Sequence, residues 1–453
     1  MSPSWTEALA AILRCPVQTD ADVLASVTRD QAPLAPAGAP AALVRARSVD
    51  DVVATLRFAH ERRIPVVTRG AGTGLAGGAN AVDGCIVLSV AAIDRIVRID
   101  PATRTAVVEP GVLNAALARE AQAVDLYYAP DPSSREISTI GGNIATNAGG
   151  ACCLKYGVTG DHVAALEVVL ADGTIIRTGS VVAKNVAGLD LTRLLVGSEG
   201  TLGVIVEATV RLRRRPGACS TLAAFFDSTE SAGRAIVAMD ARADLSLLEV
   251  MDRVTLRAVD ELTRMDLDTS AAAMVLLQSD AADAAATVAR CEAICVEHGA
   301  RGLVRADDPE EGRLLLAARR MALPALEKKG MTLLDDVSVP KPAIPALFEV
   351  TERIGARDGL VIGTFGHAGD GNLHPTIVFD RADARSAAAA YAAFDEIVRA
   401  ALDLGGSITG EHGVGSLKPG YLTAMVGETE RALMKRIKAA FDPHGILNPG
   451  KAI

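Results

Sequence analysis

The alternation of strands and helices changes character at Pro216. Before Pro216 the chain has short apolar strands joined by glycine-rich loops, and it ends in the strong strand LGVIVEATVRLRRRP. After it, Ala-rich helical stretches alternate with apolar strands, which is typical of an antiparallel sheet backed by helices. A chain of 453 residues is also too long for one hydrophobic core. We therefore predict an α+β protein with domains over 1–216 and 217–420 and a C-terminal segment over 421–453.

The charge and cysteine content narrow the class of protein. The chain has 55 Asp and Glu against 46 Lys and Arg, which argues against a nucleic-acid-binding protein. No run approaches the ~18 consecutive apolar residues of a membrane span, and the N-terminus lacks the basic start and cleavage site of a secretory signal. Seven cysteines without a C-x-x-C pair fit free thiols in a reducing compartment. We expect a cytoplasmic protein.

The first glycine-rich loop lies in PVVTRGAGTGLAGGA, residues 65–79, directly after a predicted strand. Glycines let successive backbone N–H groups approach an anion, so this loop is suited to a pyrophosphate. Gly72, Gly74 and Gly77 match the G-x-G-x-x-G pattern of Rossmann domains, but that pattern requires a helix after the glycines and here another strand follows. A dinucleotide site without the Rossmann helix and a purely structural loop both stay open.

Two more segments of the first domain combine small residues with hydrogen-bonding ones. APDPSSREISTIGGNIATNAGG, residues 129–150, sets Ser, Thr and Asn among glycines, and VGSEGTLGVI, residues 196–205, is a small-residue turn entering a strand. Segments of this kind can run alongside an extended cofactor and supply hydrogen bonds without bulk. Any one of them fits an ordinary loop, but three in one β-rich domain indicate a cofactor site.

Two histidines flank an Asp-Gly pair in GHAGDGNLHPTI, residues 366–377. Asp-Gly between apolar runs predicts a hairpin with a two-residue type I′ turn at Asp370 and Gly371. That turn would set His367 directly opposite His374, with Cβ atoms about 5 Å apart on one face of the hairpin. This geometry is suited to chelation of a metal ion.

The segment GSITGEHGVG, residues 406–415, adds a carboxylate and a third histidine. In a regular strand Glu411 and His412 would point to opposite faces. Joint action at one site therefore requires an irregular backbone, which Gly410 and Gly413 permit. Two histidines and a carboxylate suit Zn²⁺ or a similar divalent ion with open positions for a substrate. His412 would then be available as a base.

These segments, in this order, resemble the FAD-dependent D-2-hydroxyacid dehydrogenase family, which includes D-lactate dehydrogenases, D-2-hydroxyglutarate dehydrogenases and the flavin subunit of glycolate oxidase. The resemblance runs from about residue 40 to the end and rests on RGAGTGLAGGA, PSSREISTIGGNIATNAGG, GSEGTLGVI, GHAGDGNLH, GEHGVG and ILNPGK. AGGACCLKYGVT most resembles the glycolate oxidase subunit. The family implies an FAD-binding domain of the vanillyl-alcohol oxidase type, built from residues 1–216 and the returning C-terminal segment 421–453, and an intervening cap domain that carries substrate-binding groups.

The resemblance implies which residues bind FAD, because RGAGTG matches the pyrophosphate loop and small residues of the other segments match positions that line the cofactor. The residues so implied are Arg69, Gly70, Ala71, Gly72, Thr73, Gly74, Leu75, Gly77, Pro130, Ser134, Gly141, Gly142, Thr146, Gly149, Gly200, Thr201, Ile205 and Asn448. Relatives with covalent flavin carry a histidine near the end of the first glycine loop, where this chain has Thr73. We therefore expect FAD to be held non-covalently.

The resemblance also implies a metal-assisted oxidation. In metal-containing members, the residues that match His367, His374 and Glu411 hold a divalent ion, which we expect to be zinc or manganese. The residue that matches His412 takes the substrate proton. An α-hydroxy carboxylate chelates such an ion, which lowers the pKa of its hydroxyl, and the hydride on C2 passes to flavin N5.

Two further positions bear on the substrate. Arg319, in LLLAARRMALPAL, matches the family arginine that clamps the substrate carboxylate, a task suited to its planar guanidinium, and Arg320 is the alternative. The basic residue that 2-hydroxyglutarate enzymes use for a distal carboxylate is replaced by Leu334 in TLLDDVSVP. The resemblance therefore implies oxidation of a small D-2-hydroxy acid, D-lactate or glycolate, to the 2-oxo acid.

The electrons are expected to pass to a separate acceptor, since the chain lacks the cysteine clusters of an iron–sulfur centre of its own. Acceptors compatible with the family are a quinone, a cytochrome, an electron-transfer flavoprotein or an iron–sulfur subunit, and such a partner would bring the chain to the inner membrane surface. Three alternative functions stay open: a D-2-hydroxyglutarate dehydrogenase, a flavin subunit of a larger glycolate oxidase that is inactive alone, and a flavin-free metal enzyme. A homodimer is compatible with each of them.

Overall fold

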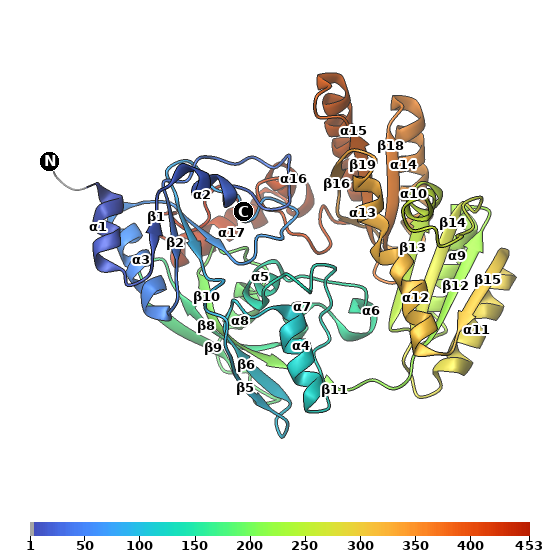
Figure 1. Cartoon of the computed structure of the whole chain (residues 1–453), viewed down its shortest axis with the longest axis horizontal. Helices are drawn as coiled ribbons and strands as arrows, with labels where there is room; N and C mark the ends of the chain where they lie inside the picture. Colours follow the sequence, from blue (N-terminus) through green and yellow to red (C-terminus); the bar gives the residue numbers. More distant parts are fainter. Residues whose placement is uncertain (1–3) are drawn as a thin grey trace. The chain divides into compact units, whose positions relative to one another are not determined.

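The computed structural model describes residues 4–453, which divide into two compact units (Figure 1). The first unit comprises residues 4–149, 157–215 and 411–453 of the described chain. The second comprises residues 150–156 and 216–410. The second unit thus ends ahead of the predicted boundary at 420, and it includes a short segment that the sequence prediction left in the first domain.

Among the described residues, the first unit contains three sheets. A mixed sheet has the order β1 (Val17–Gln18), β2 (Ala42–Arg45), β4 (Ile86–Ser89), β3 (Val66–Arg69), with β2, β4 and β3 parallel. An antiparallel sheet has the order β5 (Ile96–Asp100), β6 (Thr105–Val108), β10 (Val204–Arg211), β8 (Val163–Val169), β9 (Ile175–Gly179). The short strands β7 (Leu126–Tyr127) and β11 (Arg213–Arg214) pair with each other.

The helices of the first unit cover these sheets and include the chain's last helix. They are α1 (Trp5–Ile12), α2 (Ala21–Ser26), α3 (Val49–Arg62), α4 (Asn114–Ala123), α5 (Ile140–Thr146), α7 (Thr159–His162), α8 (Leu191–Leu195), α16 (Pro419–Val426) and α17 (Glu428–Phe441). α3 begins where the Ser48 side chain accepts a hydrogen bond from Asp51 N, which satisfies one of the unpaired N–H groups of its first turn. Its apolar stripe packs into one core cluster with β2, β3 and β4.

The C-terminal segment belongs to the first unit. Ile446 and Leu447 are buried in the same cluster as α3, and Leu447 forms a parallel bridge with Val66 of β3. The end of the chain therefore packs beside the strand that leads into the glycine loop.

The second unit is built on one eight-stranded antiparallel sheet. Its order is β15 (Ala300–Ala306), β12 (Ser220–Phe226), β14 (Ala273–Ser279), β13 (Leu247–Asp252), β18 (Val361–His367), β19 (Asn372–Phe379), β16 (Met331–Leu334), and β17 (Val337–Ser338) also pairs with β19. The helices are α6 (Cys153–Tyr156), α9 (Thr229–Asp240), α10 (Arg253–Thr263), α11 (Ala284–Glu297), α12 (Pro309–Arg320), α13 (Ala322–Glu327), η1 (Lys341–Ala343), α14 (Ile344–Asp358) and α15 (Ala384–Asp403). This antiparallel sheet with helices is the predicted architecture. Within residues 4–453 no helix has the length and apolar character needed to cross a membrane.

The β18–β19 hairpin differs from its predicted register. Phe365 pairs with His374, and His367 pairs with Asn372, so residues 368–371 form a four-residue connection. Gly371 has a φ of +75°, but Asp370 lacks the positive φ that a type I′ turn needs. The predicted turn and the direct opposition of His367 and His374 are therefore wrong. Because the register differs by two positions, an even number, both histidines still lie on one face, and their ring centroids are 5.3 Å apart.

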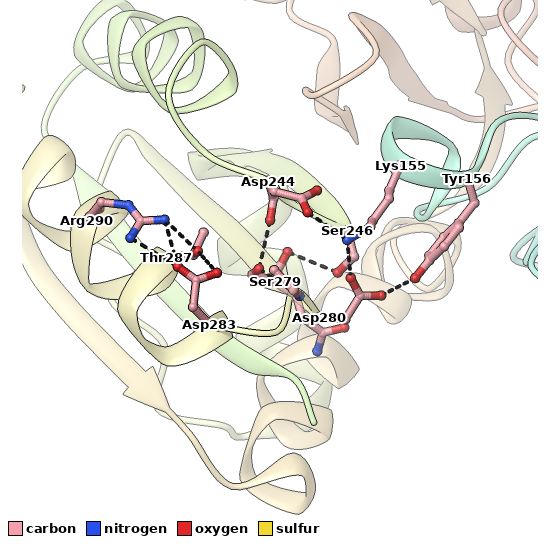
Figure 2. A network of polar contacts seen from close by, with 11 residues as sticks. Lys155, Tyr156, Asp244, Ser246, Ser279, Asp280, Asp283, Thr287 and Arg290 are labelled. Atoms are coloured by element: carbon pink, nitrogen blue, oxygen red, sulfur yellow. Dashed lines mark hydrogen bonds and ion pairs between the residues drawn. The ribbon is translucent and has the colours of Figure 1, made fainter. Parts of the chain in front are cut away.

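Residues 150–156 interrupt the first unit and dock on the second (Figure 2). Lys155 Nζ donates to Asp280 Oδ1 at 2.8 Å and to Asp244 Oδ2 at 3.1 Å. The Tyr156 hydroxyl donates to the other oxygen of Asp280, whose side chain is 4% exposed. A buried carboxylate with both oxygens occupied in this way holds the segment against the sheet.

Leu154 of the same segment reaches the turn of the histidine hairpin. A Cβ at Gly369 would lie only 2.6 Å from Leu154 Cδ2, so the two residues are in close contact. On the other side of the turn, Val339 N donates to the Gly371 carbonyl at 2.9 Å. These contacts hold the longer connection in place.

Replacement of Gly371 by alanine should destabilise the second unit more than the matched change Gly359→Ala. Both glycines have positive φ, +75° and +66°, which costs an alanine about 1–2 kcal/mol. At Gly371 the new Cβ would also overlap the Val339 carbonyl, whereas among the described residues no atom lies within 4 Å of a Cβ at Gly359. Urea unfolding followed by circular dichroism compares the two variants, and equal free energies of unfolding would contradict this close approach.

Candidate active site

The glycine loop follows β3 and leads to β4 without an intervening helix, which agrees with the rejection of a Rossmann site. Gly72 has a φ of +74°, and a Cβ there would overlap Arg69 Nη2. A Cβ at Gly70 would overlap Thr139 Oγ1. The loop therefore lies directly against the Arg69 guanidinium on one side and the 129–150 segment on the other, contacts that only glycines allow.

Two buried polar groups at the start of this loop suit an anionic ligand. Within the described part of the chain, neither the Thr68 hydroxyl nor Arg69 Nη1 has a hydrogen-bond partner. Burial lowers the pKa of Arg69, and the charge of Asp30 opposes this shift. Since buried polar groups are normally hydrogen-bonded, an unpaired guanidinium N–H beside a glycine loop fits the pyrophosphate of a dinucleotide.

The second segment contains a helix that the sequence did not predict. α5 spans Ile140–Thr146 despite its two glycines, because Thr139 caps it by accepting from Gly142 N and because Ile140 and Ile144 are buried on one side. The spacing of these two isoleucines after a capping threonine was the available signal. Of the predicted cofactor residues in this segment, Gly141, Gly142 and Thr146 lie in α5, Pro130 and Ser134 lie in the loop before it, and Gly149 lies in the loop after it.

The third segment is tied to the C-terminal tail. Asn448 Nδ2 donates to the Gly78 carbonyl at 3.0 Å and to the Glu199 carbonyl at 2.6 Å, so one amide joins the glycine loop to this segment. Gly200 has a φ of +73°, and the Thr201 hydroxyl donates to the Ser198 carbonyl. Ile205 of β10 is buried in the core beneath α5.

The carboxylate of Glu199 holds the loop that follows His412, a role that sequence reasoning missed. Its Oε1 accepts from Val414 N and its Oε2 accepts from Gly415 N, both at 2.8 Å. The side chain is buried, and a Cβ at Gly413 would lie 2.9 Å from its carboxyl carbon. Glu199 therefore fixes the backbone just after the predicted base.

Glu411 and His412 lie in the first unit on an irregular stretch of backbone. Gly413, next to His412, has a φ of +85°, and His412 Nε2 is 3.8 Å from Glu411 Oε1. A Cβ at Gly149 would overlap Glu411 Oε2. The carboxylate of Glu411 thus lies at the end of the 129–150 segment.

In the second unit, one carboxylate joins two of the predicted site residues. Glu249 Oε1 is 2.7 Å from His367 Nδ1, and Glu249 Oε2 is 2.7 Å from Arg319 Nε. The Arg319 guanidinium lies 4.8 Å from the centroid of the Phe365 ring. Burial raises the pKa of Glu249, but its contacts with His367 and Arg319 outweigh this, so its net pKa is lowered. Arg320 is exposed, so Arg319 is the arginine that faces the histidine hairpin.

The carboxylate of Asp336 binds the two residues that precede Glu411. Its Oδ2 accepts from the Thr409 hydroxyl at 2.6 Å and from Gly410 N at 2.9 Å, and its Oδ1 is 3.6 Å from His374 Nδ1. A Cβ at Gly410 would overlap the side-chain amide of Asn372. Sequence reasoning missed both Glu249 and Asp336. For Glu249, an acidic residue within the apolar strand β13 was a usable signal, whereas Asp336 lies in the connection between β16 and β17.

Comparison with protein families decides the identity of both units. Residues 40–179 match the FAD binding domain, and residues 215–452 match the C-terminal domain of FAD linked oxidases. The chain belongs to the FAD-linked oxidase family. This FAD-linked oxidoreductase is 43% identical over 416 residues to the glycolate oxidase subunit GlcD of Bacillus subtilis, which covers 91% of this chain and 88% of that one. It is 32% identical over 463 residues to the D-lactate dehydrogenase of Anaerostipes hadrus, in an alignment that covers 100% of this chain and 97% of that enzyme.

Solved structures show the fold. p-Cresol methylhydroxylase with substrate bound aligns with a TM-score of 0.82 at 19% identity, and 4-ethylphenol oxidase from Gulosibacter chungangensis aligns with a TM-score of 0.81 at 20% identity. Each alignment covers 99% of this FAD-linked oxidoreductase and 96% of the other chain. The predicted vanillyl-alcohol oxidase type of fold is confirmed, and the FAD-binding domain removes the flavin-free alternative.

Glu199→Gln should change how the stability of the protein depends on pH. Burial raises the pKa of Glu199 from 4.5 to about 7, against the N–H groups of Val414 and Gly415 and the charge of Lys451. At a pH between these two pKa values, Glu199 is protonated in the folded protein but has lost its proton in the unfolded chain. The free energy of unfolding therefore falls by up to ~3 kcal/mol as the pH rises from 4.5 to about 7. The variant cannot titrate here, so its free energy of unfolding in urea should depend less on pH. Equal pH dependence in both proteins would contradict the assignment.

Proposed function

We propose that this FAD-linked oxidoreductase oxidises a small D-2-hydroxy acid, D-lactate or glycolate, to the 2-oxo acid. The observation that carries the proposal is the carboxylate of Glu249, which joins an arginine suited to a substrate carboxylate to a histidine suited to a metal ion. An α-hydroxy carboxylate needs both groups side by side. Relatives named glycolate oxidase subunit and D-lactate dehydrogenase support this substrate class.

FAD is proposed to bind non-covalently along the glycine loop. The unpaired groups of Thr68 and Arg69, together with the loop glycines, suit its pyrophosphate. Thr73 stands where a covalent histidine would be expected. Bound FAD supplies the acceptor for the hydride that leaves C2 of the substrate.

A divalent metal, zinc or manganese, is proposed to bind His367, His374 and Glu411. The two imidazoles share one face of the hairpin with ring centroids 5.3 Å apart, and nitrogen and carboxylate ligands suit such an ion. Glu411 directly follows Gly410, whose N–H donates to Asp336 Oδ2, and its carboxylate would complete a set of two histidines and one carboxylate. A bound ion supplies a Lewis acid that lowers the pKa of the substrate hydroxyl.

Two side chains of the protein would then bind the substrate and remove its proton. The guanidinium of Arg319 holds the substrate carboxylate, and the imidazole of His412 takes the hydroxyl proton as C2 loses its hydride. The contacts of Glu199 with Val414 and Gly415 keep the backbone next to His412 in place.

The relatives' names favour a second candidate for how the activity is organised. GlcD of Bacillus subtilis and GlcD of Escherichia coli are named as glycolate oxidase subunits. This chain would accordingly pass its electrons to a separate acceptor protein or quinone, and as a subunit it would need that partner for full turnover.

Anaerobic reduction of the flavin tests the function. The purified protein is mixed with D-lactate, L-lactate, glycolate and D-2-hydroxyglutarate in turn, and the loss of flavin absorbance is recorded before and after chelation of metals. D-Lactate or glycolate should bleach the flavin, and chelation should abolish bleaching. A protein that binds FAD but is bleached by none of these acids would favour an electron-transfer or assembly role.

His412→Ala should leave FAD bound but abolish bleaching by the substrate. The side chain is offered as the base, so its removal is expected to slow reduction by about 10²–10⁴-fold. Stopped-flow reduction at saturating substrate measures the rate, and flavin absorbance confirms cofactor content. Reduction at the normal rate would remove His412 from the base role.

His374→Ala should lower the metal content of the purified protein while FAD content stays unchanged. The ring is 3% exposed beside Phe365, so His374→Phe serves as a second variant that retains a ring of similar size without a ligand nitrogen. Elemental analysis by mass spectrometry reports the bound metal. Metal content equal to wild type in both variants would contradict His374 as a ligand.

A further inference from the structure

Glu249 is a carboxylate within an apolar strand of the second unit. It lies in β13, with β14 on one side and β18 on the other, and its residue is 1% exposed. A carboxylate buried this deeply is destabilising unless charges or hydrogen bonds replace its hydration. Its two oxygens have two different partners, His367 Nδ1 and Arg319 Nε.

Strand register brings the first of these partners to Glu249. β13 and β18 run antiparallel with Val250 opposite Gly366 and Met251 opposite Phe365. Glu249 and His367 are the next residues of the two strands, so the ladder aligns their side chains. The second partner, Arg319, lies in the last turn of α12, and its guanidinium packs against the ring of Phe365 in β18.

We infer that Glu249 is a positioning residue that sets the tautomer of His367 with one oxygen and the orientation of Arg319 with the other. The inference rests on the proposed function. Histidine binds a metal through an unprotonated nitrogen. When Nδ1–H donates to Glu249, the ring presents unprotonated Nε2, as in carboxylate–histidine–metal arrangements.

The other oxygen has an equivalent effect on the arginine. An ion pair at Nε, with Phe365 against the guanidinium, sets the direction of the planar group. Both Nη groups then remain to form the two parallel bonds that a substrate carboxylate accepts. One buried side chain thus couples the metal ligand to the substrate clamp.

Glu249→Gln separates this role from simple burial because the amide keeps the shape of the carboxylate but has only one acceptor. If the amide oxygen faces His367, its NH₂ lies against the Arg319 guanidinium, and the ion pair with that group is lost. If the NH₂ faces His367 instead, Nδ1 must accept and the ring proton moves to Nε2. Either orientation disturbs one of the two partners.

The test uses the full chain with FAD bound. ¹⁵N-histidine NMR of the metal-free protein, assigned by loss of the signal in His367→Asn, should show the Nδ1–H tautomer in wild type. Zn²⁺ affinity, measured by competition with a chromophoric chelator, should fall about 10- to 100-fold in Glu249→Gln. The KM for D-lactate or glycolate should rise about ten-fold if the Arg319 contact is the one disturbed.

Asp252→Asn is the matched control, since Asp252 lies buried in the same strand but contacts Thr255 N and Thr364 N instead. It should lower stability without changing Zn²⁺ affinity or KM. An Nε2–H tautomer in wild type would overturn the inference, and so would a Glu249→Gln protein with unchanged Zn²⁺ affinity and KM. The expected tautomer in a wild-type protein that no hydroxy acid reduces would instead contradict the proposed function and leave the positioning role supported.

Discussion

Burial of carboxylates is the constraint that organises the functional segments of both units. A carboxylate removed from water is unfavourable by several kcal/mol unless N–H groups or positive charges replace its hydration. Glu199, Glu249 and Asp336 are all buried, and each finds its partners in segments distant in sequence. Within each unit, satisfying these groups therefore fixes the segments that carry the histidines and the arginine.

The chain around Glu411 and His412 shows how this works. On one side, Asp336 binds Thr409 and Gly410 within the second unit, and on the other side Glu199 binds Val414 and Gly415 within the first. The residues between them are anchored at both ends by buried carboxylates, although they have no regular secondary structure. Such anchoring lets an irregular backbone present neighbouring side chains in a defined way, which a regular strand would not.

Local patterns predicted the elements better than their register. The antiparallel sheet with helices in the second unit follows from strand and helix periodicity, and the glycine loop without a Rossmann helix follows from the strand after it. The two-residue turn predicted from the Asp-Gly pair was wrong because contacts of the connection with Leu154 and Val339 outweigh the local preference for a type I′ turn. α5 escaped detection because two glycines lower helix propensity, while burial of Ile140 and Ile144 compensates.

Residue types and their order were enough to predict the family and the fold. They also supplied the basis for the proposals of glycine loops for a dinucleotide, imidazoles and a carboxylate for a metal ion, and an arginine for a substrate carboxylate. Residue type and order suffice for these because they depend on local chemistry. The packing of distant segments was needed to show that Arg319, and not Arg320, faces the histidine hairpin, and that Glu249 contacts both Arg319 and His367. Those choices depend on strand register and on the cost of burying charge, which arise only when distant segments pack together.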